Sequence, residues 1–418
     1  MRIVIDMQGL QASNSKRGIG RYILNFIKNF IKQNKDNDII LLCNGMLQDS
    51  IGVIKDEFFE HVDSTSFRVW HAMPGVSYIN IENKSKIEVA ERIREDYIAR
   101  LEPDLVILTS LFEGLVDDAV TSINTYEKPV KTAVILYDLI PLIHSEIYLE
   151  NPVVKDWYLK KISNLKRADF LLSISHSSGK EAVDYLHFSA DKVFNISTAA
   201  SSFFEKRVYL ESEIQDWKTK FSITRKYILY TGGIDFRKNI ERLIEAYALL
   251  SLSQRKDYQL AIVCSITEQD LTRLKNLCKK LGLNNDEVIF TGYISEEDLL
   301  AFYNLCEFFV FPSWHEGFGL PILEAMHCGK AVIGGKYSSI PEVINNEQAL
   351  FDPYDITSIC SSLSKLITDH AFRSELEKHS SKQCEYFSWE QTSNLAWTAI
   401  NNNINSTKMN AAALVPRN

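Results

Sequence analysis

The amino-acid sequence predicts an α/β protein built from two doubly wound domains. Three observations lead to this fold class. Short apolar runs alternate with helical patterns almost from end to end, most of these runs are continuous, and the 418 residues exceed what one core usually supports. Continuous apolar runs are typical of parallel strands that helices cover on both faces.

The expected strands fall into two series. The first comprises 2–6, 38–43, 104–109, 132–138, 169–175 and 192–197. The second comprises 227–232, 259–264, 287–292, 308–313 and 331–335. Between them, apolar residues recur at helical spacing, as in the stripe formed by Ile23, Phe26, Ile27, Phe30 and Ile31. Ser295, three residues before Asp298, predicts the start of another helix.

A polar segment at 204–221 separates the two series and is the predicted linker. We therefore expect an N-terminal domain at 1–205 and a C-terminal domain at 206–385. A last helix is expected at 386–405. Residues 411–418 resemble a vector-derived tail and are excluded from the fold prediction.

Composition narrows the class of protein. The formal charge of -8 and the sequence pI of about 5.7 give no basic excess for nucleic-acid binding. The seven cysteines form no CxxC pair and lie in apolar stretches, which indicates reduced, buried thiols. The N-terminus starts directly with a strand pattern, and no apolar run approaches the roughly 20 residues of a membrane helix. We expect a soluble, cytoplasmic protein.

The first strand–helix junction carries Gly18 and Gly20 just before an amphipathic helix. Glycine turns expose backbone amides, and a helix N-terminus attracts anions. A nicotinamide dinucleotide site is disfavoured, because Ile23 stands where a third glycine is needed and "LLCNG" lacks an acidic residue. Turn glycines without a ligand remain an equal alternative.

The corresponding junction of the second half places Gly232 and Gly233 after a strand, followed by Arg237 and Lys238. A guanidinium binds phosphate oxygens in pairs, and an ammonium adds a point charge. Two cations at the carboxyl edge of a parallel sheet therefore favour a diphosphate ligand over a merely exposed pair.

The stretch "SWHEGFGLPILEA" combines a glycine turn with two carboxylates, Glu316 and Glu324. Pro321 fits the first helical position, which would put Glu324 in the first turn, and Gly329 would close the helix. Carboxylates accept hydrogen bonds in pairs and suit the vicinal hydroxyls of a ribose or hexose. The amides between them could meet phosphate or sugar.

Together, "EGFGLPILEA", "GGIDFRKN", "RGIGRY", "YDLIPL" and "ADFLLSISHSS" resemble the family-four retaining glycosyltransferases of GT-B fold, over essentially the whole chain. The pair "RGIGRY" and "YDLIPL" is most similar to bacterial mannosyltransferases that build O-antigen and related polysaccharides. The resemblance implies two Rossmann-like domains facing across a cleft, an N-terminal one for the acceptor and a C-terminal one for the nucleotide-sugar donor. It also implies that the last helix returns to the N-terminal domain.

The resemblance further implies roles for individual residues. Arg237 and Lys238 would clamp the donor diphosphate, Glu324 would bind the ribose, and Glu316 would bind the transferred hexose. Further donor-binding positions implied in this way are Gly18, Gly20, Gly233, Tyr293 and Ile294 beside the base, and the backbone at Phe318, Gly319 and Leu320.

One position departs from the family pattern. Many relatives have His-Asp where this chain has Tyr137 and Asp138. A tyrosine donates a hydrogen bond but carries no positive charge near neutral pH. Asp138 would then position the sugar or the acceptor, with Tyr137 against the donor.

The implied reaction moves a hexose, mannose from GDP-mannose, onto a glycan or lipid-linked acceptor with retained anomeric configuration. A UDP- or dTDP-sugar is the alternative donor. No DxD-like motif occurs in a suitable place, so we expect no metal and no further cofactor. The segment 155–170 is basic and aromatic; it could touch the inner membrane face, but a solvated helix packed by Trp157 and Ile162 is favoured.

Other classes stay open at this point. A glycoside hydrolase could use Glu316 and Glu324 as its two carboxylates, but it would leave Arg237 and Lys238 without a role. A non-catalytic GT-B subunit is a third possibility, against which the complete motifs argue. A sugar-nucleotide epimerase of the same fold is the nearest enzymatic rival, and no matching motif set is present.

Overall fold

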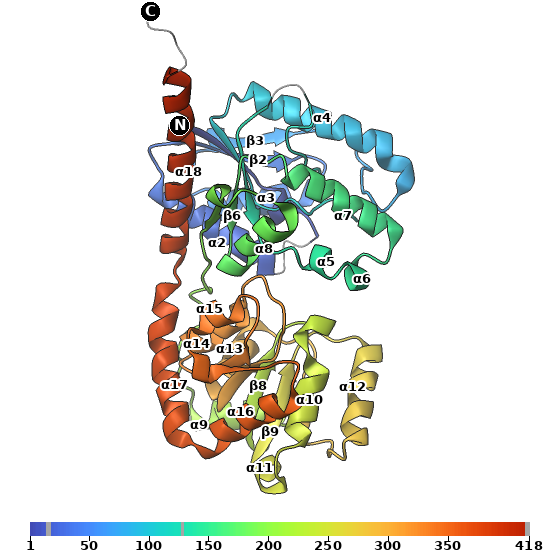
Figure 1. Cartoon of the computed structure of the whole chain (residues 1–418), viewed down its shortest axis with the longest axis vertical. Helices are drawn as coiled ribbons and strands as arrows, with labels where there is room; N and C mark the ends of the chain where they lie inside the picture. Colours follow the sequence, from blue (N-terminus) through green and yellow to red (C-terminus); the bar gives the residue numbers. More distant parts are fainter. Residues whose placement is uncertain (14–17, 127–128, 414–418) are drawn as a thin grey trace, which may run out of the picture. The chain divides into compact units, whose positions relative to one another are not determined.

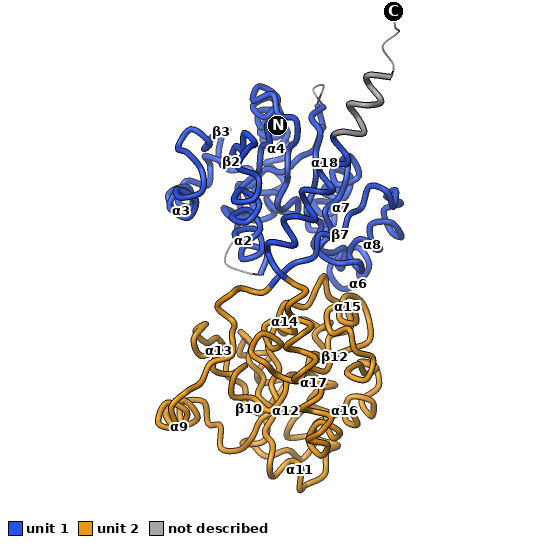
Figure 2. The backbone as a smooth tube through the Cα atoms, turned by 90° about the vertical axis from the view of Figure 1, so that its left-hand side faces the viewer, with its two compact units in different colours: residues 1–199, 388–418 blue, residues 200–387 orange. Residues whose placement is uncertain are grey.

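The computed structural model describes residues 1–13, 18–126 and 129–413, with side chains of the last helix described up to residue 404. The chain forms two compact units (Figure 2). Unit 1 comprises residues 1–199 together with 388–418, and unit 2 comprises residues 200–387. The first boundary lies a few residues before the predicted one. Of the predicted tail at 411–418, only 411–413 are described, as the end of a helix.

Unit 1 is built around a seven-stranded parallel sheet in the order β3-β2-β1-β4-β5-β6-β7. Its strands are β1 (Arg2–Asp6), β2 (Asp38–Asn44), β3 (Phe67–Trp70), β4 (Leu105–Leu108), β5 (Thr132–Leu136), β6 (Phe170–Ser173) and β7 (Val193–Asn195). Its helices are α1 (Gln8–Gln11), α2 (Gly18–Gln33), α3 (Asp49–Phe58), α4 (Lys84–Arg100), α5 (Ile140–Ile143), α6 (Ser145–Tyr148), α7 (Pro152–Leu165), α8 (His176–Leu186) and α18 (Trp389–Ala413).

Unit 2 contains a six-stranded parallel sheet in the order β10-β9-β8-β11-β12-β13. Its strands are β8 (Lys226–Thr231), β9 (Tyr258–Val263), β10 (Val288–Phe290), β11 (Phe308–Phe311), β12 (Ala331–Gly335) and β13 (Leu350–Phe351). Its helices are α9 (Glu211–Lys220), α10 (Ile240–Ala248), α11 (Leu252–Asp257), α12 (Glu268–Lys280), α13 (Glu296–Leu305), α14 (Leu320–His327), α15 (Ile340–Ile344), α16 (Ile356–Thr368) and α17 (His370–Gln383).

Helices cover both faces of each sheet, as the continuous apolar strands require (Figure 1). The predicted stripe on α2 is buried throughout. In unit 2, Ser295 accepts a hydrogen bond from the Asp298 amide and caps α13, as predicted. All seven cysteines are free thiols, and six of them are buried.

The C-terminal helix α18 packs on α2 in unit 1 (Figure 1). Aromatic rings join the two helices, with centroid distances of 5.2 Å between Tyr22 and Trp389 and 6.1 Å between Phe30 and Trp397. The segment after residue 387 therefore completes the first unit, as the resemblance implied.

The predicted linker at 204–221 is corrected by the structure. Its second half forms α9, whose Trp217 ring lies 4.4 Å from the ring of Phe302, between ring centroids. The segment looked like a linker because Trp217 is the one buried residue of a mostly polar helix. It is part of unit 2.

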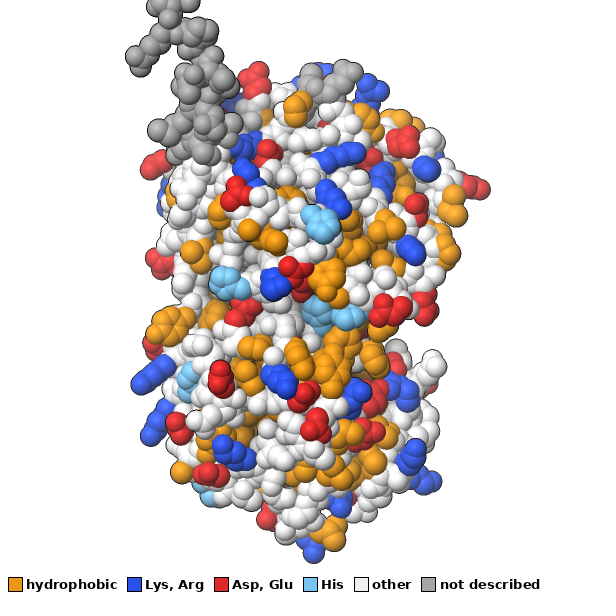
Figure 3. All heavy atoms as spheres, in the orientation of Figure 1, with side chains coloured by type: hydrophobic (Ala, Val, Ile, Leu, Met, Phe, Trp, Pro, Cys, Tyr) orange, Lys and Arg blue, Asp and Glu red, His pale blue; other side chains and the backbone are white. Residues whose placement is uncertain are grey.

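The basic, aromatic segment at 155–170 forms α7 and the start of β6. Trp157, Tyr158 and Ile162 are buried, and Lys161 is buried with its Nζ donating to the Thr121 carbonyl at 2.9 Å. The aromatic and basic residues therefore do not share an exposed face, which agrees with the favoured prediction of a packed helix. On the face shown in Figure 3, positive and negative side chains are interspersed over both units. Among the described residues, no helix combines the length and apolar composition needed to cross a bilayer.

Candidate active site

Two loops meet where the strand order of unit 2 reverses. The first strand, β8, lies between β9 and β11, so the loops that follow β8 and β11 leave adjacent carboxyl ends in opposite directions. Open α/β sheets bind ligands at such a point. The two loops are tied together, because the Trp314 amide donates to the Arg237 carbonyl at 3.1 Å and the Asn239 side-chain amide donates to the Pro312 carbonyl at 3.1 Å.

Glycine is required in both loops. Gly232 has a φ of 149°, and a Cβ there would approach the Tyr230 hydroxyl to 2.9 Å. Gly319 has a φ of 109°, and a Cβ there would lie 3.1 Å from Ile322. Larger residues rarely adopt either conformation, so the predicted glycine turns are confirmed.

The start of α14 differs from the prediction by one residue. Because Gly319 caps the helix in a left-handed conformation, Leu320 is the first helical residue and Pro321 the second. Glu324 therefore lies beyond the first turn of α14, and that first turn contains no acidic residue. The helix dipole falls off within the first turn, so it does not account for this carboxylate.

Arg237, Lys238 and Glu316 form one cluster at the loop junction. The two carboxylate oxygens of Glu316 bind different cations, one to Arg237 Nη1 and one to Lys238 Nζ, both at 2.6 Å. The side chains of Arg237 and Lys238 are 20% and 12% exposed, and that of Glu316 is 8% exposed. The structure thus brings together three of the four residues predicted to be catalytic.

The electrostatics of this cluster favour ionised Glu316. Burial opposes ionisation, but the charges of Lys238 and Arg237 outweigh it and lower the pKa of Glu316 to about 2. The backbone is held as well: the Glu316 amide donates to the Ser338 hydroxyl at 2.9 Å, and the Ser339 hydroxyl donates to the Glu316 carbonyl at 3.0 Å. This is a fixed carboxylate between two cations.

Glu324 is positioned by a residue that the sequence did not identify. The Tyr303 hydroxyl donates to Glu324 at 2.7 Å and lies 2.6 Å from the Thr231 hydroxyl, which is left as the donor of that second bond. Thr231 ends β8, directly before Gly232, so this chain of hydrogen bonds links Glu324 to the first loop. Tyr303 was missed because a buried tyrosine at helical spacing reads as an ordinary core residue. Its position five residues before the buried run of β11 offered no separate signal.

The other predicted residues of unit 2 fall into two groups. Phe318, Gly319, Leu320 and Gly233 belong to the two loops, whereas Tyr293 and Ile294 lie farther along the sheet edge. Phe318 is buried against Phe387, and Gly319 and Leu320 join the loop to α14. The Gly233 carbonyl accepts a hydrogen bond from the Tyr230 hydroxyl at 2.7 Å. Tyr293 and Ile294 follow the edge strand β10, which β9 separates from β8, and Tyr293 is 85% exposed.

In unit 1, the structure corrects the glycine turn predicted at Gly18 and Gly20. The helix α2 begins at Gly18, so both glycines are helical, and a Cβ on Gly18 would meet nothing within 4 Å. The residues just before it, 14–17, lie outside the described part of the chain.

Tyr137 and Asp138 follow the carboxyl end of β5. The Tyr137 hydroxyl donates to the Thr109 carbonyl, which follows β4, at 2.9 Å, and its ring stands edge-on to Tyr22 with centroids 5.4 Å apart. Asp138 accepts from the Ile140 amide at 3.1 Å at the start of α5. Both are thus held at the sheet edge, and their roles remain predictions.

Within the described ranges, no group of three or more His, Cys, Asp or Glu side chains is arranged to hold a metal ion. The expectation of a metal-independent reaction stays a prediction.

Comparison with known proteins gives this site a family context. The family described as "Glycosyl transferases group 1" matches residues 211–383, which contain the whole cluster. The chain is 38% identical over 397 residues to a serotype-specific mannosyltransferase, WbdA, from Escherichia coli, covering 95% of this chain and 47% of that protein. It is also 32% identical to an O-antigen chain mannosyltransferase B from Escherichia coli, over 54% of this chain and 59% of that protein. The chain spans about half the length of these curated relatives.

Solved structures share the fold at low sequence identity. Sucrose-phosphate synthase from Thermosynechococcus elongatus has a TM-score of 0.70 at 17% identity, covering 97% of this chain and all of that chain. Anabaena HepE in complex with UDP and glucose has a TM-score of 0.65 at 15% identity, covering 96% and 100%. The chain therefore has the GT-B fold, and its residues 211–383 match the family model described as group 1 glycosyl transferases.

Proposed function

We propose that this chain is a retaining mannosyltransferase that transfers mannose from GDP-mannose to a glycan or lipid-linked acceptor during bacterial polysaccharide synthesis. The observation that carries the proposal is the cluster of Arg237, Lys238 and Glu316 at the strand-order reversal of unit 2. The names of the curated relatives support the sugar and the O-antigen context.

The donor diphosphate would lie against Arg237 and Lys238. As the bond between the sugar C1 and the diphosphate oxygen breaks, negative charge accumulates on the departing phosphate, and two preorganised cations stabilise it. Because their side chains are largely buried, the interaction is stronger than it would be in bulk water. Both cations would thus act mainly on the transition state rather than on donor binding alone.

The two carboxylates would bind the hydroxyl groups of the donor. Glu316, ionised and fixed at its backbone, would accept hydrogen bonds from the hexose, and Glu324 from the ribose. The acceptor hydroxyl would form the new bond to C1 on the face that the diphosphate leaves, and its proton would pass to the departing phosphate oxygen. Asp138 in unit 1 would position the sugar or the acceptor.

The glycoside hydrolase alternative fits the geometry less well. Such an enzyme needs one carboxyl group with a raised pKa as the general acid. The pKa of Glu316 is lowered to about 2, and its oxygens are already bound to two cations. Glu316 is therefore ionised at neutral pH and cannot act as the general acid. A hydrolase mechanism would have to assign that role to Glu324.

A thermal-shift panel of GDP, UDP and dTDP, each with its sugar, tests the proposal. A ligand that binds only the folded state at a hundred times its Kd stabilises by about 2.7 kcal/mol. We expect GDP and GDP-mannose to give the largest shift in melting temperature. A larger shift with UDP or dTDP would change the donor, and no shift with any nucleotide would contradict the proposal.

The aromatic residues of α7 are buried, so a peripheral membrane contact at this helix would rest on its exposed lysines. If the acceptor is lipid-linked, the enzyme would meet it at the inner membrane face. Sedimentation with vesicles containing anionic lipid measures this directly. Binding that persists when Lys155 and Lys166 are replaced by alanine would argue against α7 as the contact.

A further inference from the structure

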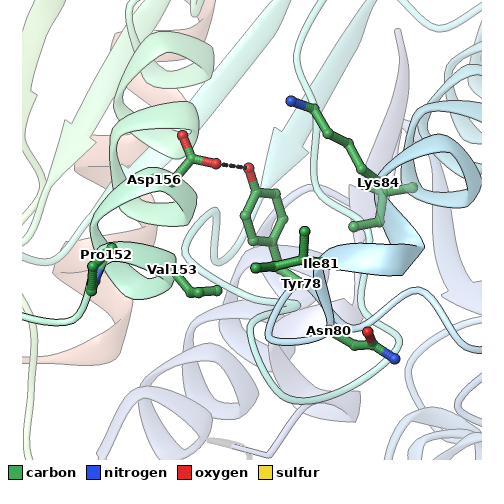
Figure 4. A pocket seen from close by; sticks show the side chains of 8 residues that line it. Tyr78, Asn80, Ile81, Lys84, Pro152, Val153 and Asp156 are labelled. Atoms are coloured by element: carbon green, nitrogen blue, oxygen red, sulfur yellow. Dashed lines mark hydrogen bonds between the residues drawn. The ribbon is translucent and has the colours of Figure 1, made fainter.

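A cavity that contains none of the predicted site residues opens in unit 1. Its volume is about 220 Å³, and it lies between the short helix η2 (Ile81–Asn83) with the start of α4 on one side and the start of α7 on the other (Figure 4). The lining residues that matter here are Tyr78, Ile81, Lys84, Ile87, Val153 and Asp156.

The cavity is built from segments that follow the carboxyl ends of several strands. Tyr78 follows β3, and its backbone amide donates to the Gly114 carbonyl in the segment after β4 at 3.0 Å. Val153 and Asp156 belong to α7, which follows β5 and the short helices α5 and α6. Parallel α/β sheets bind their ligands at this edge. The position is therefore one where a ligand is expected on physical grounds.

The walls are apolar and the rim is polar. Ile81 and Val153 flank the ring of Tyr78 (Figure 4), and the buried side chain of Ile87 also lines the cavity. Ile81 is 73% exposed, which leaves a large aliphatic side chain in solvent at the mouth. Pockets for small molecules commonly combine such apolar walls with a few convergent polar groups.

Two polar groups mark the rim. The Tyr78 hydroxyl donates to one carboxylate oxygen of Asp156 at 2.8 Å. Burial of that hydroxyl, together with the hydrogen bond to Asp156, raises the pKa of Tyr78, so it remains a neutral donor. The Asp156 carboxylate keeps its other oxygen for a further donor. Lys84 also lines the cavity, and its ammonium offers three donors.

We propose that this cavity is a saccharide subsite that holds one pyranose ring of the acceptor glycan. A pyranose presents an apolar C–H face to aliphatic and aromatic side chains and directs its hydroxyls to a polar rim. The charges of Lys84 and Asp156 offset each other, so an anionic ligand has no net attraction to the site. A lipid chain would fill the apolar walls but would remove Asp156 and Lys84 from water without replacing their hydrogen bonds.

The subsite deepens the proposed function and rests on it. A glycan that is held in unit 1 as well as at its reacting end binds with more contacts, and only its terminal hydroxyl needs to reach the donor. The chain would then favour acceptors long enough to fill the cavity over single sugars.

Binding of α-linked mannotriose to the full chain tests the subsite. Ligand-detected NMR measures the binding, and the KM for the acceptor measures its effect on transfer. We expect Asp156→Ala to weaken mannotriose binding about tenfold, the loss typical of one hydrogen bond to a charged group. Ile81→Ser, at an exposed position where folding is not at stake, should weaken it as well. Lys155→Ala is the matched control, because it changes an exposed residue of α7 beside Asp156 that does not line the cavity.

Three results would overturn the subsite: no binding of mannotriose to the wild-type chain, equal effects of Asp156→Ala and Lys155→Ala, or variant-sensitive binding of farnesyl phosphate in place of mannotriose. The GDP thermal shift separates this failure from that of the proposed function. GDP binding that is unchanged in Asp156→Ala leaves the function standing, whereas a wild-type chain that binds no nucleotide removes the function itself.

Discussion

The two units share one topology but use its reversal point in different ways. In unit 1, β1 lies between β2 and β4, and in unit 2, β8 lies between β9 and β11. The carboxyl end of β1 carries Asp6, which is 2% exposed and forms a buried ion pair with Arg94 of α4. Gln8 and Asn44 join this network through a side-chain hydrogen bond of 2.9 Å, and both are fully buried.

The same point in unit 2 holds Arg237 and Lys238, which remain partly exposed beside Glu316. Both reversal points hold ion pairs, but the pair in unit 1 is completely buried, whereas the cations of unit 2 stay partly exposed and can meet an incoming anion. The same topology thus creates a potential ligand site in each unit. The side chains that follow the first strand decide whether that site stays accessible to a ligand or is occupied by buried side chains of the protein.

The largest expected effect comes from opening the closed network of unit 1. Arg94→Met leaves Asp6 buried without its partner, which should destabilise unit 1 by about 4 kcal/mol. Hydrogen exchange of amides in β1 and β4 would rise, while the GDP shift of unit 2 persists. The matched control is Arg92→Met on the exposed side of α4, expected to stay within about 0.5 kcal/mol. Equal stability of the two variants would mean that the network does not hold the unit together.

The next effect separates chemistry from stability in unit 2. Lys238→Ala should lower the transfer rate about 10²- to 10³-fold, the range for removing one group that stabilises a transition-state charge. Steady-state transfer from the donor identified by the thermal-shift panel measures it. Lys256→Ala, at an exposed position on α11, should transfer at the wild-type rate. Near-normal turnover of the Lys238 variant would remove this residue from the mechanism.

A third effect concerns acid stability. The pKa of Glu316 lies at about 2 when folded, against an ordinary 4.5. A carboxyl group with a lowered pKa stabilises the fold above its unfolded pKa, and this contribution is lost as pH falls from about 4.5 through about 2. Unit 2 should thus lose about 3 kcal/mol over that window. Denaturant unfolding at pH 5 and pH 2 measures the loss in free energy of unfolding. Glu316→Gln should lose about 3 kcal/mol less than the wild type between these pH values. An identical pH dependence in both proteins would contradict the assignment.

The smallest effect tests the positioning of Glu324. Tyr303→Phe removes the hydroxyl between Glu324 and Thr231 and should raise the donor KM about tenfold, with kcat less affected. Tyr227→Phe is the control, because its buried hydroxyl donates to the Phe302 carbonyl in the same unit. Tyr303→Phe loses the buried hydrogen bonds to Glu324 and Thr231, and Tyr227→Phe loses one buried hydrogen bond that does not involve Glu324. A KM change shared by both would show that the effect is structural.

Much of this fold was readable in the sequence because buried parallel strands leave continuous apolar runs. The strands β3 and β13 were not predicted, since β13 has two residues and β3 contains the charged Arg68. The helix α9 was hidden for a similar reason, because one tryptophan carries its packing. Short or polar elements depend on neighbours that lie far away in the chain, and local pattern does not reveal them.

The candidate site was predictable in part for the same physical reason. Arg237, Lys238 and Glu316 are marked by glycine turns, which are local signals. The pairing of Asp6 with Arg94, 88 residues apart, and the contact between Tyr303 and Glu324 have no local signature. Side-chain contacts across a sheet or between helices are decided by the tertiary fold.

Because α18 packs in unit 1, the two units differ in how they can be separated by truncation. Unit 2 is a continuous stretch, 200–387, and can be excised with its sheet complete. Unit 1 is discontinuous, so a fragment ending at residue 199 would expose the rings of Tyr22 and Phe30 that α18 covers. Removal of residues 388–404 would therefore damage unit 1, although unit 2 lies nearer to the cut along the chain.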